Sequence, residues 1–102
     1  MRKISLIPYK CDGLDYDVRK SLASMMFIPE LHLGARDIIE NDRIARKIES
    51  AQDEVVLEEA EYARIKQSFD LFQNYSRNDL ELIRRARDAP EIDANTPSNG
   101  GN

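Results

Sequence analysis

Residues 34–51, GARDIIENDRIARKIESA, decide the fold class of this chain, because their apolar side chains recur at the spacing of one helical face. Ile39 falls outside that face, and the opposite side carries Asp42 and Arg46 in an order that stabilises a solvated helix by about 0.2–0.5 kcal/mol. The pattern predicts an amphipathic helix whose buried face carries Ile38, Ile44, Ala45, Ile48 and Ala51.

A shorter helix precedes this one. Asp17 is a suitable N-cap, and apolar residues then recur at helical spacing until Pro29 ends the helix. The residues expected on its buried face are Val18, Leu22, Met25 and Met26.

Two further helices follow. The third, over residues 58–72, begins with acidic side chains that complement the helix dipole. The fourth begins at Asn78, whose spacing to Glu81 matches a variant capping box, and ends before Pro90. The residues expected to point inward are Tyr62, Ile65, Phe69 and Phe72 from the third helix and Leu80, Ile83 and, less clearly placed, Leu82 from the fourth.

Strand signals are short. Residues 3–9 predict a strand that Pro8 restricts to an edge or an end, residues 11–13 predict a turn, and residues 53–57 predict a segment that could pair with the first strand. We therefore expect a mostly helical α+β fold, with about four short amphipathic helices and a small two- or three-stranded sheet. Residues 1–93 are expected to form a single globular domain, and residues 94–102 a disordered polar C-terminal tail.

Composition narrows the class of protein. Apolar residues make up 41% and charged residues 33% of the 102 residues, which argues against wholesale disorder and against a membrane protein. The apolar stretch at the start is broken by Pro8 and Lys10 before it could act as a signal peptide. The single cysteine, Cys11, cannot form an intrachain disulfide, so the sequence predicts a cytoplasmic protein.

The sequence gives little support for a catalytic or metal site. Asp12, Asp15 and Asp17 could hold a divalent cation, but a turn followed by an N-cap explains them better, since the spacing is not that of a calcium-binding loop. His32 has no second histidine and Cys11 has no evident base to lower its pKa. We expect no catalytic residue, no metal and no cofactor. A metal- or thiol-dependent enzyme built on Cys11 and the acidic cluster is the least favoured alternative.

A nucleic-acid partner is also disfavoured. The net charge is −4 and the pI is near 5.0, whereas binding to phosphates needs many unpaired cations. Two basic clusters stand out, namely Arg43, Arg46 and Lys47 in the helix over residues 34–51, and Arg84, Arg85 and Arg87 in the fourth helix. Both are mixed with acids, and Glu81 can pair with Arg85 and Asp88 with Arg84. A small nucleic-acid-associated transcriptional regulator is therefore the alternative, with possible contacts from Arg84, Arg85 and Arg87.

Residues 16–22 (YDVRKSL), 55–62 (VVLEEAEY) and 78–81 (NDLE) resemble small accessory proteins encoded in tailed-phage genomes. The resemblance implies an accessory role in virion assembly, or a small factor acting on phage or host machinery, in the host cytoplasm or the virion. It carries no binding or catalytic residue over to this chain.

The favoured interpretation is a non-enzymatic interaction or assembly protein that forms homo-oligomers or docks a protein partner through a helix. Phe27 lies about 180° from the apolar face of the first helix, so it could form an exposed partner-binding patch with its neighbours. Alternatively, the chain leaves helical geometry before Pro29 and turns Phe27 into the core. The predicted partner-binding residues are Met26, Phe27 and Ile28.

Overall fold

The computed structural model describes residues 1–92 of the chain. Four α-helices and two small antiparallel sheets confirm the predicted α+β, mostly helical class. In chain order these elements are β1 (Arg2–Ser5), β2 (Tyr9–Cys11), β3 (Leu14–Tyr16), α1 (Val18–Ser24), α2 (Ala35–Ser50), β4 (Glu54–Leu57), α3 (Glu59–Leu71) and α4 (Leu80–Arg87). Three single 3₁₀ turns connect them, namely η1 (Met25–Phe27), η2 (Pro29–Leu31) and η3 (Arg77–Asp79). The predicted tail, residues 94–102, lies outside the described residues.

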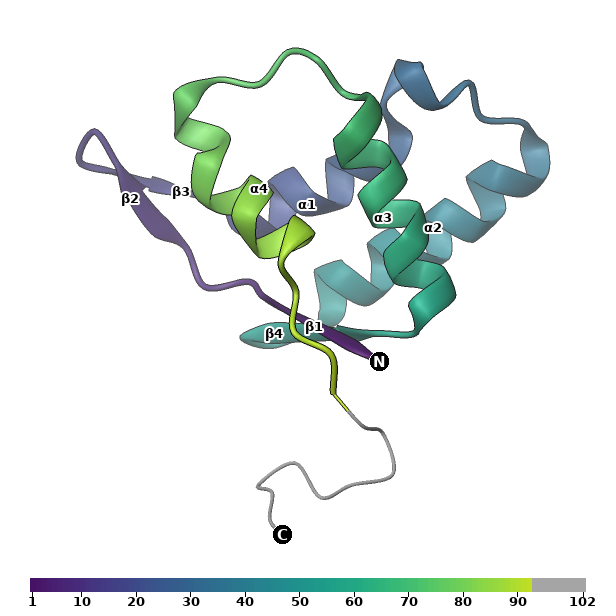
Figure 1. Cartoon of the computed structure of the whole chain (residues 1–102), viewed down its shortest axis with the longest axis horizontal. Coiled ribbons are helices and arrows are strands. Elements are labelled where there is room, and N and C mark those ends of the chain that lie inside the picture. The colour runs from purple at the N-terminus through teal and green to yellow at the C-terminus, as the bar shows by residue number, and fades with distance from the viewer. Residues whose placement is uncertain (93–102) are drawn as a thin grey trace, which may run out of the picture.

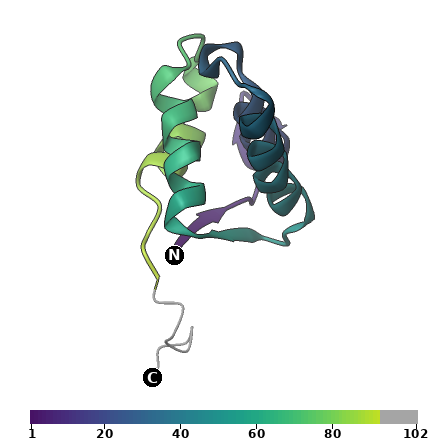
Figure 2. The same ribbon diagram turned by 90° about the vertical axis from the view of Figure 1, so that its right-hand side faces the viewer.

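The helices form two layers. Helices α1 and α2 pack on each other, α3 packs on α4, and η1 and η2 contact α3. Figure 2 shows the two layers side by side with the β1–β4 ribbon joining them at one end, and Figure 1 shows the β2–β3 hairpin reaching out beside α4. The buried apolar side chains of the helices and strands together form one hydrophobic cluster. Within residues 1–92, no helix has the length and apolar character needed to cross a bilayer.

The observed strands differ from the predicted ones in their boundaries. Strands β1 and β4 pair antiparallel as expected, with Ile4 opposite Val55 and both side chains buried. The single strand predicted over residues 3–9 is wrong, because β1 ends at Ser5 and a new strand starts at Tyr9 after Pro8, which cannot donate a backbone hydrogen bond. Residues 11–13 do turn, and the turn leads into a strand, β3, that was not predicted.

Helix α1 begins as predicted, since the Asp17 carboxylate accepts a hydrogen bond from the backbone N–H of Lys20 at 3.0 Å. The α-helical geometry ends at Ser24 and the 3₁₀ turn η1 follows, so the chain does leave the α-helix before Pro29. The four residues predicted on the inner face of this segment are buried, namely Val18, Leu22, Met25 and Met26.

Helix α2 matches its prediction to within one residue at each end, but its inner face is different. Ile38 is 43% exposed, so its predicted burial is wrong, whereas Asn41 is buried. The Asn41 amide donates to the backbone carbonyl of Met26 at 2.8 Å and its oxygen accepts from Arg64 at 3.1 Å. These bonds satisfy a buried polar group and tie α2 to η1 and α3.

Helix α3 buries Tyr62, Ile65 and Phe69 as predicted, while Phe72 packs against the edge of the core. The Tyr62 hydroxyl donates to the carbonyl of Ala86 at 2.7 Å, which fixes α3 against α4.

The start of α4 corrects two predictions. Asn78 is not the cap, because it lies inside η3, whose N-cap is Ser76, and the backbone N–H of Ser76 donates to the Asp79 carboxylate at 2.8 Å. Leu80 is 46% exposed rather than inward, whereas Leu82 is buried together with Ala86. Leu80 lies about 200° around the helix from Leu82, so the two cannot share one buried face.

We expect Ile65→Ala to lower the free energy of unfolding by about 2–5 kcal/mol, because the side chain is fully buried in the core. The matched control is Ile39→Ala, at a position that is 60% exposed, which should change it by less than about 0.5 kcal/mol. Chemical denaturation of both variants measures the difference. Equal stability of the two variants would contradict the assignment of the core face of α3.

Candidate docking surface

The β2–β3 hairpin has two chemically different faces. Its register pairs Tyr9 with Tyr16 and Cys11 with Leu14, and residues paired directly across an antiparallel ladder point to the same side. The alternate pair, Lys10 and Asp15, points to the other side and forms an exposed ion pair at 2.9 Å. The hairpin therefore presents one aromatic and apolar face and one charged face.

The aromatic face lies against η3 and the start of α4. The hydroxyl of Tyr9 donates to the carbonyl of Asn78 at 2.8 Å, and the Cys11 thiol lies 3.6 Å from the same oxygen. The Tyr16 hydroxyl donates to the Asp79 carboxylate at 2.5 Å. The rings of Tyr9 and Tyr16 stack with their centroids 4.6 Å apart. These contacts hold the hairpin beside η3 and the start of α4.

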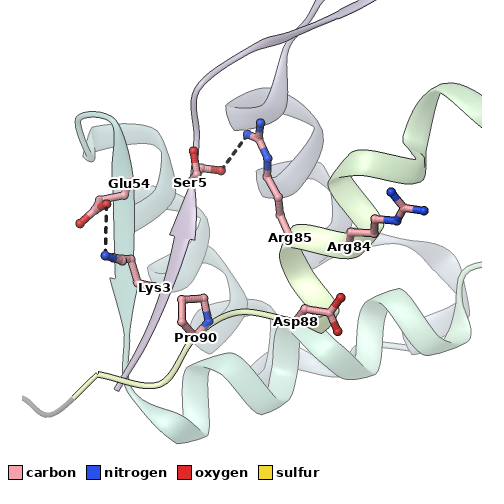
Figure 3. Close-up of a pocket in the computed structure, with 7 residues that line it drawn as sticks. All are labelled: Lys3, Ser5, Glu54, Arg84, Arg85, Asp88 and Pro90. Atoms are coloured by element: carbon pink, nitrogen blue, oxygen red, sulfur yellow. Dashed lines mark hydrogen bonds and ion pairs between the residues drawn. The ribbon is translucent and has the colours of Figure 1, made fainter.

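Arg85 holds the base of the hairpin. Its guanidinium donates to the carbonyls of Ser5 at 3.3 Å and Ile7 at 2.6 Å, pairs with Glu81 at 3.0 Å and lies 5.3 Å from the centre of the Tyr9 ring. Figure 3 shows this guanidinium turned toward Ser5, while that of the neighbouring Arg84 points away. Adjacent arginines of one helix thus have different surroundings.

A groove of about 610 Å³ lies between the hairpin and the helical segment, and we call it the hairpin groove. The hairpin contributes Tyr9, Lys10, Cys11 and Asp12. The helical side contributes Arg77, Asn78, Leu80, Glu81 and Arg84. Arg84 also lines a smaller hollow of about 330 Å³ on its other side, bounded by residues of β1, β4 and the segment after α4 (Figure 3). Arg84 therefore lies at the junction of two hollows.

The predicted nucleic-acid residues do not form one basic surface. Arg85 is used inside the fold, and Arg87 pairs with Asp70 at 2.5 Å. Arg84 is exposed and forms no ion pair within residues 1–92, so the predicted pair with Asp88 is wrong. On α2, the basic side chains of the other cluster pair with acids, namely Arg43 with Glu40, Arg46 with Asp42 and Lys47 with Glu61.

The three residues of the predicted partner patch, 26–28, differ in exposure. Met26 and Ile28 are buried, and only Phe27 is exposed, at 41%. The predicted three-residue exposed patch is therefore wrong, because the 3₁₀ turn directs Met26 inward and the extended residue Ile28 packs into the core. A role of Phe27 alone in partner binding stays a prediction.

The three acids of the predicted cluster have separate structural roles. Asp17 caps α1, Asp15 pairs with Lys10, and Asp12 occupies the left-handed region of the hairpin turn with φ of 51°. Across the part of the chain that the structure describes, no group of three or more His, Cys, Asp or Glu side chains is placed to hold a metal ion. His32 is exposed at the end of η2, where its backbone N–H donates to the carbonyl of Pro29.

The hairpin groove was missed at the level of sequence, although a signal was present. Residues 9–16, YKCDGLDY, alternate in polarity on both sides of Asp12-Gly13, and Asp-Gly between alternating segments is typical of a two-residue hairpin turn. Gly13 has φ of 81°, as such a turn requires. No protein-family model, no curated protein and no solved structure matches this chain. Any role of this surface must therefore be inferred from its geometry.

The pKa values of the tyrosines reflect how these side chains are packed in the fold. Burial is the largest cause that raises the pKa of all four, namely Tyr9, Tyr16, Tyr62 and Tyr75, from an ordinary value of 10.0. The hydrogen bond donated to Asp79 raises the pKa of Tyr16 further, and the pKa of Tyr75 reaches about 12.

We expect ultraviolet titration of the folded chain to show less tyrosinate at pH 10 than titration of the unfolded chain does, because all four pKa values are raised by folding. The folded state then holds protons that the unfolded state releases, so the stability contributed by these groups is intact below pH 10 and is lost as the pH rises above it. Tyr16→Phe should weaken this loss. Identical titration curves for the folded and unfolded chains would contradict the packing of the hairpin.

Proposed function

We propose that this chain is a non-enzymatic interaction protein that docks a protein partner in the hairpin groove. The observation that carries the proposal is the exposure of two leucines, Leu80 in the lining of the groove and Leu14 opposite the lining residue Cys11 in the hairpin. Leu14 is 74% exposed, although it lies on the hairpin face whose other side chains pack against η3, and the exposed Leu80 lines the groove itself. A single exposed leucine is ordinary on a protein surface, but apolar side chains beside a concave surface are typical of binding sites.

The hairpin is held in a fixed position beside the groove. Strands β2 and β3 pair with each other, and no further strand within residues 1–92 pairs with either of them. Tyr9 and Tyr16 hold the hairpin against the helical segment, whereas Leu14, which is paired with Cys11, stays exposed. Side chains that are held in place before binding lose less conformational entropy when a partner docks.

A partner of a different kind fits better than a second copy of the chain. In a two-fold symmetric dimer centred on the hairpin groove, the same patch would lie opposite itself. Such a dimer would bring two copies of Arg77 and two of Arg84, all without an ion pair within residues 1–92, into one interface, and an excess of like charge at an interface is unfavourable. We therefore favour partner docking over self-association through this surface.

The resemblance to tailed-phage accessory proteins suggests the setting of this interaction. We propose a role as an accessory or assembly factor that binds a virion component or a protein of the host. The alternative of a small transcriptional regulator draws less support, because Arg85 and Arg87 are engaged within the fold, and of the three only Arg84 has no ion pair within residues 1–92.

Affinity capture with the tagged chain tests the proposal. We expect a partner protein that is retained by the parent and lost with the double variant Leu14→Asp, Leu80→Asp, because both changes put a charge where an apolar contact is proposed. The matched control Ile39→Asp introduces a carboxylate at another exposed apolar position, on α2, and should retain the partner. Circular dichroism must show all variants folded. Loss of the partner with Ile39→Asp and not with the groove variant would contradict the proposed site.

A further inference from the structure

We infer that the occupant of the hairpin groove is an extended segment of a partner protein that carries two carboxylates, one bound by Arg77 and the other by Arg84. This inference rests on the proposed function and names the chemistry of the partner. It follows from which charges of the groove are already neutralised, from the spacing of the two arginines, and from the open edge of strand β2.

Two guanidinium groups that line the groove have no ion-pair partner within residues 1–92. Lys10 pairs with Asp15 and Glu81 pairs with Arg85, whereas Arg77 and Arg84 are exposed and have no ion pair within residues 1–92. Asp12 is the one remaining acid that lines the groove among the described residues. A protein with a net charge of −4 thus keeps a positive surplus at this groove. Guanidinium groups bind carboxylates through paired hydrogen bonds, which gives geometric specificity as well as affinity.

The spacing of the arginines sets the spacing of their ligands. One 3₁₀ turn and one α-helical turn separate Arg77 from Arg84, a rise of about 12 Å along the axis. An extended chain covers that distance in about three to four residues. Leu80 lies between the two arginines in the sequence and lines the same groove. The matching segment would therefore carry two acids about three to four residues apart, with an apolar side chain between them.

An extended occupant suits the hairpin side of the groove. Strand β2 supplies Tyr9, Lys10 and Cys11 to the lining, and its edge away from β3 pairs with no other strand of the described chain (Figure 1). Extended peptides commonly bind by adding to such an edge, because the backbone hydrogen bonds of the edge supply affinity. A nucleic acid suits the groove less well, because the carboxylates of Asp12 and Glu81 would lie close to its phosphates.

Selection of linear peptides from a random display library on the folded full chain tests the inference. We expect the enriched peptides to share two acidic residues about three to four positions apart. A synthetic copy of an enriched peptide should bind about tenfold more weakly to the double variant Arg77→Gln, Arg84→Gln, and its own Glu→Gln copy should bind the parent about tenfold more weakly. Glutamine removes the charge without adding a repulsive one, so the variant should stay folded.

The matched control is Lys20→Gln, Arg36→Gln, which removes two other exposed cations that have no ion pair within the described chain. It lowers the net charge equally and should bind the peptide as the parent does. Enriched peptides without shared acids, binding that survives Arg77→Gln, Arg84→Gln, or an equal loss with the control variant would each overturn the inference. So would binding of duplex DNA at about 150 mM salt that Arg77→Gln, Arg84→Gln abolishes, because the site would then recognise phosphate. Apolar peptides whose binding depends on Leu14 and Leu80 would leave the proposed docking function standing without this partner class.

Discussion

The placement of the hairpin beside α4 depends on the guanidinium of Arg85. This one group donates to the carbonyls of Ser5 and Ile7, pairs with Glu81 and lies over the ring of Tyr9. It joins the helix to the segment that runs from β1 into the hairpin, and hydrogen bonds from a charged donor are about twice as strong as neutral ones. Once the base of the hairpin is held there, Tyr9 and Tyr16 reach η3 and one wall of the groove is in place.

Within residues 1–92, Arg85 is one of three arginines that bind backbone carbonyls of distant segments. Arg2 donates to the carbonyl of Ala89 at 3.0 Å. Arg19 donates to the carbonyls of Ile48 at 2.9 Å and Gln52 at 2.6 Å, at and just after the C-terminal end of α2, where the last carbonyls of a helix lack their regular helical partners. The basic side chains of this fold thus divide into those that hold the chain together and those left at its surface. Arg77 and Arg84 belong to the second group, and this is why they dominate the chemistry of the groove.

Sequence periodicity predicted the helices and most of the core, because burial follows the 3.6-residue repeat wherever a neighbouring element covers the helix. It misjudged Ile38, because periodicity identifies a face but does not show how far along the helix that face is covered. It misjudged Leu80, because the face of α4 that is buried carries Leu82 and Ala86 instead. It also missed Asn41, which is buried only because Met26 and Arg64 satisfy its amide. The groove joins β2 to η3 across more than sixty residues of sequence, and such a contact cannot be read from local patterns.

The single cysteine of the chain, Cys11, lines the groove between the hairpin and α4, where we propose that a partner docks. The most direct measurement is therefore the rate at which iodoacetamide alkylates Cys11, with the chain alone and with a saturating amount of its captured partner. We expect the bound partner to slow alkylation by about tenfold or more, since reaction requires access to the thiol. An unchanged rate with the partner fully bound would show that the partner docks elsewhere.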